Sequence, residues 1–329
     1  MREPQNAGGG SMTLEMQATN MNMVARSLID AVGSFIEGKP EAVELAVITL
    51  LAEGHLLLED VPGVGKTSLA LSLAHAIGVP WSRVQFTPDL LPSDVTGAAV
   101  FHQGTSTFEF HPGPVFASIV LADEINRSSP RTQSALLEAM QERAVTVDGH
   151  THPLPRPFMV IATQNPIEMS GTYPLPEAQL DRFLMRISLG YPARSAEIRV
   201  LAAQASGATI DRVAQVVSPE QFESLLHEVS LVTIEAELLD YIVSISEATR
   251  IAPSIELGVS PRGSVAMMRA ARAYALVHGR DFVMPGDIQA LAAPVLAHRI
   301  VLEPGAQARG QSPEAVIRGI IETTPAPQP

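Results

Sequence analysis

A glycine-rich turn between an apolar run and a helical stretch constrains the fold of this chain more than any other feature. The turn, DVPGVGKT, occupies residues 60–67 and follows the largely apolar run at 55–58. Such a run is typical of a central parallel strand that is buried on both faces. Residues 67–77 then have helical character, without proline or internal glycine. Strand, glycine-rich turn and helix in this order predict a phosphate-binding loop within an α/β fold.

The residue types in this turn suit the binding of a nucleoside triphosphate. Glycines allow successive backbone N–H groups to turn towards phosphate oxygens, and the following helix adds its positive end. We expect Lys66 to reach the β- and γ-phosphates and Thr67 to hold Mg²⁺. The usual pattern opens with glycine where this chain has Asp60, but the PGVGKT core is intact, so we expect binding to be retained. The residues expected to bind nucleotide here are Pro62, Gly63, Val64, Gly65, Lys66, Thr67 and Ser68.

Two acidic residues follow a second apolar run. The segment IVLA at 119–122 is followed directly by Asp123 and Glu124. Because parallel strands end at the same edge of a sheet, Asp123 is expected beside the phosphate loop, where it can hold Mg²⁺. Glu124 is expected to point elsewhere and to polarise the attacking water as a general base. Adjacent acids are common on protein surfaces, so this interpretation depends on the apolar run and the phosphate loop together.

A third strand candidate ends in polar amides. Residues 161–166 read IATQNP, and Asn165 is expected to lie between the two earlier strand ends, where it would orient water or the γ-phosphate. The alternative is an ordinary turn after a strand, since Asn-Pro is a common turn initiator. The match with the chemistry of the other two strand ends favours the functional interpretation.

The pattern of elements changes once along the chain. Strand-like segments at 81–86, 116–122 and 158–162 alternate with helical stretches, which predicts a parallel sheet with helices on both faces. From about residue 193 the strand signals stop, and helical stretches follow at 195–205, 219–229, 234–249, 264–278 and 286–296. We therefore expect a flexible leader at 1–22, an α/β nucleotide-binding domain at 23–190, a smaller all-helical lid at 193–322 and a frayed tail at 323–329.

Charge and cysteine content narrow the class of partner. The formal net charge is −13, so no overall basic field is available to hold a nucleic-acid backbone, and a nucleic-acid partner is disfavoured. Cysteine is absent, which excludes disulfides and thiolate catalysis and suits a reducing cytoplasm. The N-terminus lacks the apolar core of a signal peptide, and the apolar runs are too short to span a bilayer. We expect a soluble, cytoplasmic protein.

Longer segments carry a resemblance to one protein family. They are LEDVPGVGKT at 58–67, QFTPDLLPSDVTG at 85–97, ADEINR at 122–127, ATQNP at 162–166 and GTYPLPEAQLDRF at 171–183. With these segments the chain resembles, over about residues 32–302, the MoxR branch of the AAA+ ATPases. The second and last segments are far more specific than a phosphate loop. The resemblance implies an ATPase whose nucleotide lies between the subunits of a ring, which we expect to be a homohexamer.

The resemblance also implies roles for three arginines. Arg182 matches an arginine finger that acts on the nucleotide of a neighbouring subunit, with Arg127 as the second candidate. The plain alternative is a surface arginine paired with Asp181. Arg262 matches a second sensor that reports the γ-phosphate from the lid. Ser260 as N-cap, followed by proline, predicts that Arg262 lies at a helix start. A salt bridge within the lid is the alternative for Arg262.

Two segments resemble insertions of the wider clade that contains the magnesium chelatase motor subunit and replicative helicases. Residues 94–114 are expected to form a hairpin-like excursion within the second helix. Residues 144–155 are expected to form a hairpin with an Asp-Gly turn. In a ring such hairpins would face the central channel and contact clients, and the alternative is that they only pack at an edge.

The sequence therefore predicts an ATPase that depends on ATP and Mg²⁺. By resemblance, the purine pocket is expected near Phe35, Ile36 and Gly38, and adenine is favoured because no Asn-Lys-x-Asp guanine motif occurs. MoxR-like proteins look like chaperones that remodel or activate partner complexes, often proteins with a von Willebrand factor A domain or metalloenzymes. Two alternatives stay open: a nucleic-acid-translocating motor of the same clade, and a scaffold that binds ATP with little turnover. The sequence does not identify the client.

Overall fold

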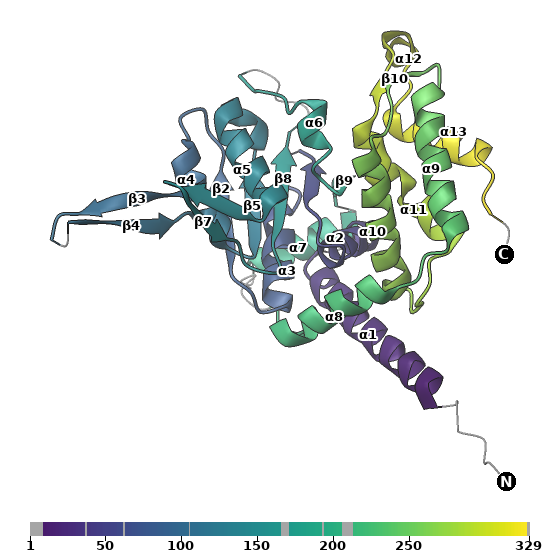
Figure 1. Cartoon of the computed structure of the whole chain (residues 1–329), viewed down its shortest axis with the longest axis horizontal. Helices are drawn as coiled ribbons and strands as arrows, with labels where there is room; N and C mark the ends of the chain where they lie inside the picture. Colours follow the sequence, from purple (N-terminus) through teal and green to yellow (C-terminus); the bar gives the residue numbers. More distant parts are fainter. Residues whose placement is uncertain are drawn as a thin grey trace.

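The computed structural model describes the backbone of residues 9–36, 38–61, 63–104, 106–165, 171–192, 194–205 and 213–327. Figure 1 shows an α/β part around a sheet and, beside it, a helical part coloured green to yellow. The predicted fold class, an α/β core followed by a helical lid, is confirmed. Within the described residues no helix is both long and apolar enough to cross a membrane. Pro62, expected to bind nucleotide, lies outside the described residues.

A five-stranded sheet forms the centre of the α/β part, in the order β2-β5-β8-β1-β9. Every neighbouring pair is parallel. The strands are β1 (Leu56–Glu59), β2 (Trp81–Gln85), β5 (Ile119–Asp123), β8 (Met159–Gln164) and β9 (Met185–Ile187). The first four were expected from the sequence. Strand β9 was missed because three residues are too few to give a periodic pattern or an apolar run.

The strands of this sheet face two separate hydrophobic cores. Leu56 and Leu58 of β1 belong to one core, and Leu57 between them belongs to the other, as the two-residue period of a strand requires. All three leucines are fully buried. The first core is covered by α1 (Gly9–Gly33), α2 (Pro40–Leu51) and α3 (Lys66–Ala76), and the second by α5 (Pro130–Glu142). The run before the phosphate loop is therefore apolar because both of its faces are buried.

The helical lid shares the first of these cores. Phe222 and Ile288 of the lid belong to the same buried cluster as Leu56, so the lid is packed against the α/β part. Its helices are α7 (Arg194–Ala205), α8 (Pro219–Leu231), α9 (Ala236–Ile251), α10 (Pro261–Val277), α11 (Pro285–Leu296), α12 (Pro304–Ala308) and α13 (Pro313–Thr323). The strands β10 (Ile255–Leu257) and β11 (Val301–Leu302) add an antiparallel ribbon. The lid is therefore not all-helical as predicted, and the two strands are too short to give a pattern in the sequence.

The N-terminal helix departs from the predicted flexible leader. Helix α1 begins at Gly9, inside the range 1–22, and continues to Gly33. Residues 12–21 are rich in methionine and also contain leucine, glutamate, glutamine and alanine, which favour helix, and this outweighs the linker-like GGGS at 8–11. At the other end, α13 ends at Thr323, the first residue of the predicted tail. Ala326 beyond it packs against the main core.

Both predicted hairpins are present. The first consists of β3 (Gly97–His102) and β4 (Thr107–Pro112), and the second of β6 (Ala144–Val147) and β7 (His150–Pro153). The first hairpin follows the short helix α4 (Pro92–Thr96) and projects away from the sheet (Figure 1). Its exposed cross-strand pair, Phe101 and Phe108, has ring centroids 5.1 Å apart.

His55, directly before β1, is buried in its neutral form. Its Nδ1 atom accepts a hydrogen bond from the backbone N–H of Val160 at 3.0 Å. Its Nε2 atom, 3.1 Å from the carbonyl oxygen of Met140, is then the donor. Burial is the main reason why the pKa of His55 is lowered from 6.5 to about 4. Protonation of this ring in the folded protein would require a charge in an apolar site.

We expect the folded state to lose stability as the pH falls from about 7 to about 5. The pKa of His55 is lower in the folded than in the unfolded chain, so the unfolded chain binds a proton first as the pH falls. Stability is therefore lost as the pH drops below the unfolded pKa of 6.5 towards the folded pKa of about 4. The contribution of His55 over this range is about 2 kcal/mol. Urea unfolding at both pH values measures it, with His55→Asn as control because Asn Oδ1 can still accept from Val160. An equally steep loss in the control would contradict the assignment to His55.

Candidate active site

The phosphate loop lies at the carboxyl end of β1. Gly63 and Gly65 have φ angles of +84° and +101°, a left-handed conformation that residues with a side chain rarely adopt. A Cβ atom built at either position meets nothing within 4 Å, so the loop borders open space there. Helix α3 begins at Lys66, directly after Gly65 as N-cap, and Thr67 and Ser68 lie in its first turn. Free N–H groups at a helix start, beside an open loop, fit a phosphate group.

Asp60, which stands where the usual pattern has glycine, anchors this loop to the end of β9. Its carboxylate is buried and accepts hydrogen bonds from the Ser188 hydroxyl at 2.8 Å and from the backbone N–H groups of Leu189 and Gly190. Its backbone oxygen accepts from Lys66 Nζ at 2.9 Å. The departure from the usual phosphate-loop pattern therefore has a structural role at the loop.

Asp60→Ala is expected to lower the free energy of unfolding by about 2–4 kcal/mol, because it leaves the buried N–H of Leu189 and the half-buried N–H of Gly190 without an acceptor. Urea unfolding measures the change. Asp240→Ala is the matched control, since Asp240 is an exposed aspartate on α9. Equal stability of the two variants would show that the anchor does not matter for folding.

Asp123 and Thr163 meet at the carboxyl edge of the sheet. Asp123 is the last residue of β5, and its Oδ1 accepts from the Thr163 hydroxyl of the adjacent strand β8 at 2.7 Å. Its Oδ2 forms an ion pair with Arg83 of β2 at 2.6 Å. A carboxylate here, with a hydroxyl at the start of α3, is the oxygen chemistry that Mg²⁺ takes in proteins. The residues present thus fit the predicted metal site at Thr67 and Asp123.

Glu124 turns away from Asp123. Its backbone has φ 56° and ψ 49°, an uncommon left-handed conformation for a residue with a side chain. Its N–H donates to the Thr163 hydroxyl at 2.8 Å. Its carboxylate accepts from Gln85 Nε2 at 2.9 Å and pairs with Arg127 Nη1 at 3.2 Å. The two residues share the Thr163 hydroxyl, but their carboxylates have separate partners, as two separate roles require.

Arg83 and Gln85 were missed as candidate site residues by the sequence analysis. Both lie on β2, which neighbours β5, and Gln85 is the strand's last residue, in register with Asp123. The signal available in the sequence was a polar residue at a strand end, the same signal that identified Asp123. It could be used only once the strand order placed β2 beside β5.

Asn165 and the expected purine-pocket residues occupy different surroundings. Asn165 is buried directly after β8, at the same edge as Asp123. Ile36 is buried in the main core. Gly38 lines a cavity of about 460 Å³ together with Pro40, Leu45 and two lid residues, Pro294 and Glu314. The structure thus brings Gly38, but not Ile36, to an open cavity between the α/β part and the lid.

Arg182 and Arg262 line one cavity at the opposite edge of the sheet. The backbone N–H of Leu184, just before β9, donates to the carbonyl oxygen of His55, just before β1, so this is the amino edge of both strands. The cavity has a volume of about 200 Å³ and is lined by the arginines Arg143, Arg182, Arg262, Arg269 and Arg299, among others. The four residues of β1, about 13 Å, separate this edge from the phosphate loop. The cavity that holds Arg182 and Arg262 is lined by no described residue of that loop.

The positive charges of Arg182 and Arg262 repel each other across this cavity. Burial, and secondly the positive charge of Arg262, lower the pKa of Arg182. Arg262 donates a long hydrogen bond, 3.5 Å, to Gln141. Asp181, the expected alternative partner of Arg182, instead pairs with Arg299 at 2.9 Å. Two cations that face one cavity favour an anion from outside the chain.

Known proteins match both parts of the chain. A model of the ATPase family associated with various cellular activities (AAA) matches residues 55–185, and a model of the AAA lid domain matches residues 247–320. The uncharacterized protein YeaC of Bacillus subtilis is 52% identical over 91% of this chain and 93% of its own length. Chaperone MoxR1 of Mycobacterium tuberculosis is 42% identical over 94% of this chain and 84% of its own. The crystal structure of a proposed ATPase from Cytophaga hutchinsonii is 38% identical and has a TM-score of 0.89, covering 96% of this chain and 99% of that one.

Proposed function

This chain belongs to the MoxR family of AAA+ ATPases, and on that premise we propose that it couples Mg²⁺-dependent ATP hydrolysis in an oligomeric ring to chaperone-like remodelling of partner proteins. The observation that carries the proposal is the group of side chains at the carboxyl edge of the sheet. There the phosphate loop follows β1, Asp123 and Glu124 lie at the end of β5 two strands away, and the two carboxylates have separate partners.

In this proposal each residue of that edge has one role. The backbone N–H groups of the loop at 63–68 and Lys66 bind the phosphates, and Thr67 and Asp123 hold Mg²⁺, which supplies positive charge against the β- and γ-phosphates. Glu124 takes the proton of the attacking water, and Gln85 orients its carboxylate through the 2.9 Å contact. Asn165 orients the water or the γ-phosphate. Adenine occupies the cavity lined by Gly38, between the α/β part and the lid.

The position of Arg182 and Arg262 supports a ring of subunits in head-to-tail contact. In a head-to-tail contact the amino edge of one subunit's sheet meets the carboxyl edge of the next subunit's sheet. Repetition of this contact forms a ring when its rotation closes on itself. Both arginines then act on the neighbour's γ-phosphate, so we propose a trans role for Arg262 in place of the expected role on its own nucleotide. Arg127 pairs with Glu124 of its own chain, which favours Arg182 over Arg127 as the trans arginine.

We propose a protein client, of the class with a von Willebrand factor A domain or a metalloenzyme complex, as the family resemblance implies. The net charge of −13 disfavours the alternative of a nucleic-acid motor. The exposed hairpin pair Phe101 and Phe108 offers apolar surface for such a client.

An ATP-dependent pull-down tests the client class. Glu124→Gln loaded with ATP serves as bait, and Lys66→Ala, which is expected not to bind ATP, serves as the matched control. Recovery of a partner of the proposed class with the first bait alone supports the proposal. Salt-sensitive recovery of nucleic acid would favour the motor, and identical recovery with both baits would favour a scaffold.

A further inference from the structure

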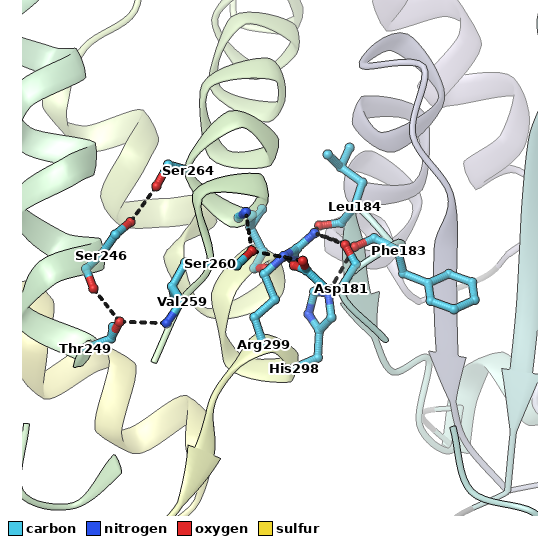
Figure 2. A network of polar contacts seen from close by, with 12 residues as sticks. Asp181, Phe183, Leu184, Ser246, Thr249, Val259, Ser260, Ser264, His298 and Arg299 are labelled. Carbon is cyan, nitrogen blue, oxygen red and sulfur yellow. Dashed lines mark hydrogen bonds and ion pairs between the residues drawn. The ribbon is translucent and has the colours of Figure 1, made fainter. Parts of the chain in front are cut away.

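A polar network joins the α/β part to the lid around Asp181 (Figure 2). Asp181 lies between α6 (Glu177–Leu180) and β9, on the α/β part. Its Oδ1 pairs with Nε of Arg299 at 2.9 Å, and its Oδ2 accepts from the hydroxyl of Ser260 at 2.9 Å. Arg299 ends the 3₁₀ helix η3 (Ala297–Arg299), and Ser260 is the N-cap of α10. One carboxylate therefore holds two separate points of the lid.

Arg299 is buried, and its guanidinium donates hydrogen bonds to the segment that carries Arg182. Its Nη2 donates to the carbonyl oxygen of Phe183 at 2.6 Å and its Nη1 to that of Leu184 at 3.1 Å. Burial lowers the pKa of Arg299 to about 10, so it stays charged at neutral pH. Gly263 of α10 leaves room for it, since a Cβ there would lie 2.9 Å from Arg299 Cδ.

The start of α10 is also fixed from the lid side. The Thr249 hydroxyl of α9 accepts from the backbone N–H of Val259 at 2.9 Å. The hydroxyls of Ser246 and Ser264 lie 2.9 Å apart and join the same two helices (Figure 2). Ser260 itself accepts from the N–H of Gly263 at 3.3 Å. The start of α10 is therefore fixed relative to α9, and the bond from the Ser260 hydroxyl to Asp181 joins this unit to the α/β part.

Arg182 follows Asp181 directly, and Arg262 lies two residues after Ser260 in the same cavity. We propose that Asp181, Ser260 and Arg299 form a positioning clamp that holds Arg182 and Arg262 as one unit, so that both reach the neighbour's γ-phosphate in a fixed geometry. This inference rests on the trans site of the proposed function.

The clamp has a physical purpose because Arg182 and Arg262 carry like charges. Free side chains of this kind would separate, and bringing them together during hydrolysis would oppose the reaction. Cationic donors that are already in place stabilise developing charge without reorganisation. Asp181 is suited to this task since it contacts both elements that carry the arginines.

Ser260 variants test the clamp with little risk to folding. Ser260→Ala removes the hydroxyl that donates to Asp181, and Ser260→Thr keeps one. Ser312→Ala is the matched control, because Ser312 also precedes a proline and caps a lid helix, accepting from the N–H of Ala315 at 3.2 Å. We expect kcat of Ser260→Ala to fall on the order of ten- to hundredfold, since small misplacements of catalytic groups have effects of this size. Its Kd for ATP should be unchanged, and the threonine variant and the control should keep native kcat.

Two further measurements distinguish positioning from structure. Mixed with Lys66→Ala subunits, whose clamp is intact, Ser260→Ala should regain turnover, because the arginines act on the neighbour. In a chain that already carries Arg182→Ala and Arg262→Ala, the additional change Ser260→Ala should not lower kcat further. Equal kcat losses in Ser260→Ala and Ser312→Ala, or a loss that mixing does not restore, would overturn the clamp. If Arg182→Ala itself shows no rescue, the proposed trans site fails; if it is rescued while Ser260→Ala behaves natively, only the clamp fails.

Discussion

Glu124→Gln is expected to bind ATP as tightly as the native chain and to hydrolyse it about 10²–10⁴-fold more slowly, the range associated with loss of a general base. The amide has the size of the carboxylate but cannot accept the proton of the attacking water. The phosphate loop and Asp123, which bind nucleotide and metal in our proposal, stay unchanged. Phosphate release gives kcat, and titration with a fluorescent ATP analogue gives Kd.

Glu237→Gln is the matched control for this prediction. Glu237 is exposed in the first turn of α9, on the lid, and lies outside the carboxyl edge of the sheet, so the turnover of this variant should be native. A kcat for Glu124→Gln within about tenfold of native would assign the general base to another residue, because a general base contributes more than this.

Arg182→Ala is expected to lower kcat by about 10³–10⁵-fold, the contribution of an arginine finger in related phosphoryl transfer. The Kd for ATP should change little, because Arg182 lies at the edge of the sheet opposite its own phosphate loop. Steady-state turnover and nucleotide titration separate the two effects. A loss of ATP affinity in the pure variant, with kcat retained, would contradict the assignment.

Mixing with Lys66→Ala distinguishes a trans role from a cis role. An equal mixture of the two inactive variants should recover up to about a quarter of native turnover, since that share of contacts in a random ring pairs an intact loop with an intact arginine. Arg262→Ala should behave in the same way if Arg262 also acts in trans. If mixing restores turnover to Arg182→Ala but not to Arg262→Ala, Arg262 acts on the nucleotide of its own chain.

Much of the site could be predicted because its parts lie at strand ends within short segments. Lys66, Asp123 and Glu124 each follow an apolar run, and parallel strands bring their ends to one edge. The position of Arg262 could not be predicted. Its helix start was correctly expected from Ser260, but the edge of the sheet against which that helix packs depends on contacts with residues distant in sequence, such as Asp181. Gln85 was missed for a related reason, since its relation to Glu124 follows from strand order.

Strand β9 connects the phosphate loop of a subunit to the clamp at the opposite edge of its sheet. At its carboxyl end, residues 188–190 bind Asp60 beside the phosphate loop, and at its amino end Asp181 holds the clamp. The strand has three residues, about 10 Å. In the proposed ring, this short strand would join a subunit's own nucleotide loop to the arginines that act on its neighbour. Each interface of that ring would then be linked to the next, which favours hydrolysis in order around the ring over hydrolysis at random.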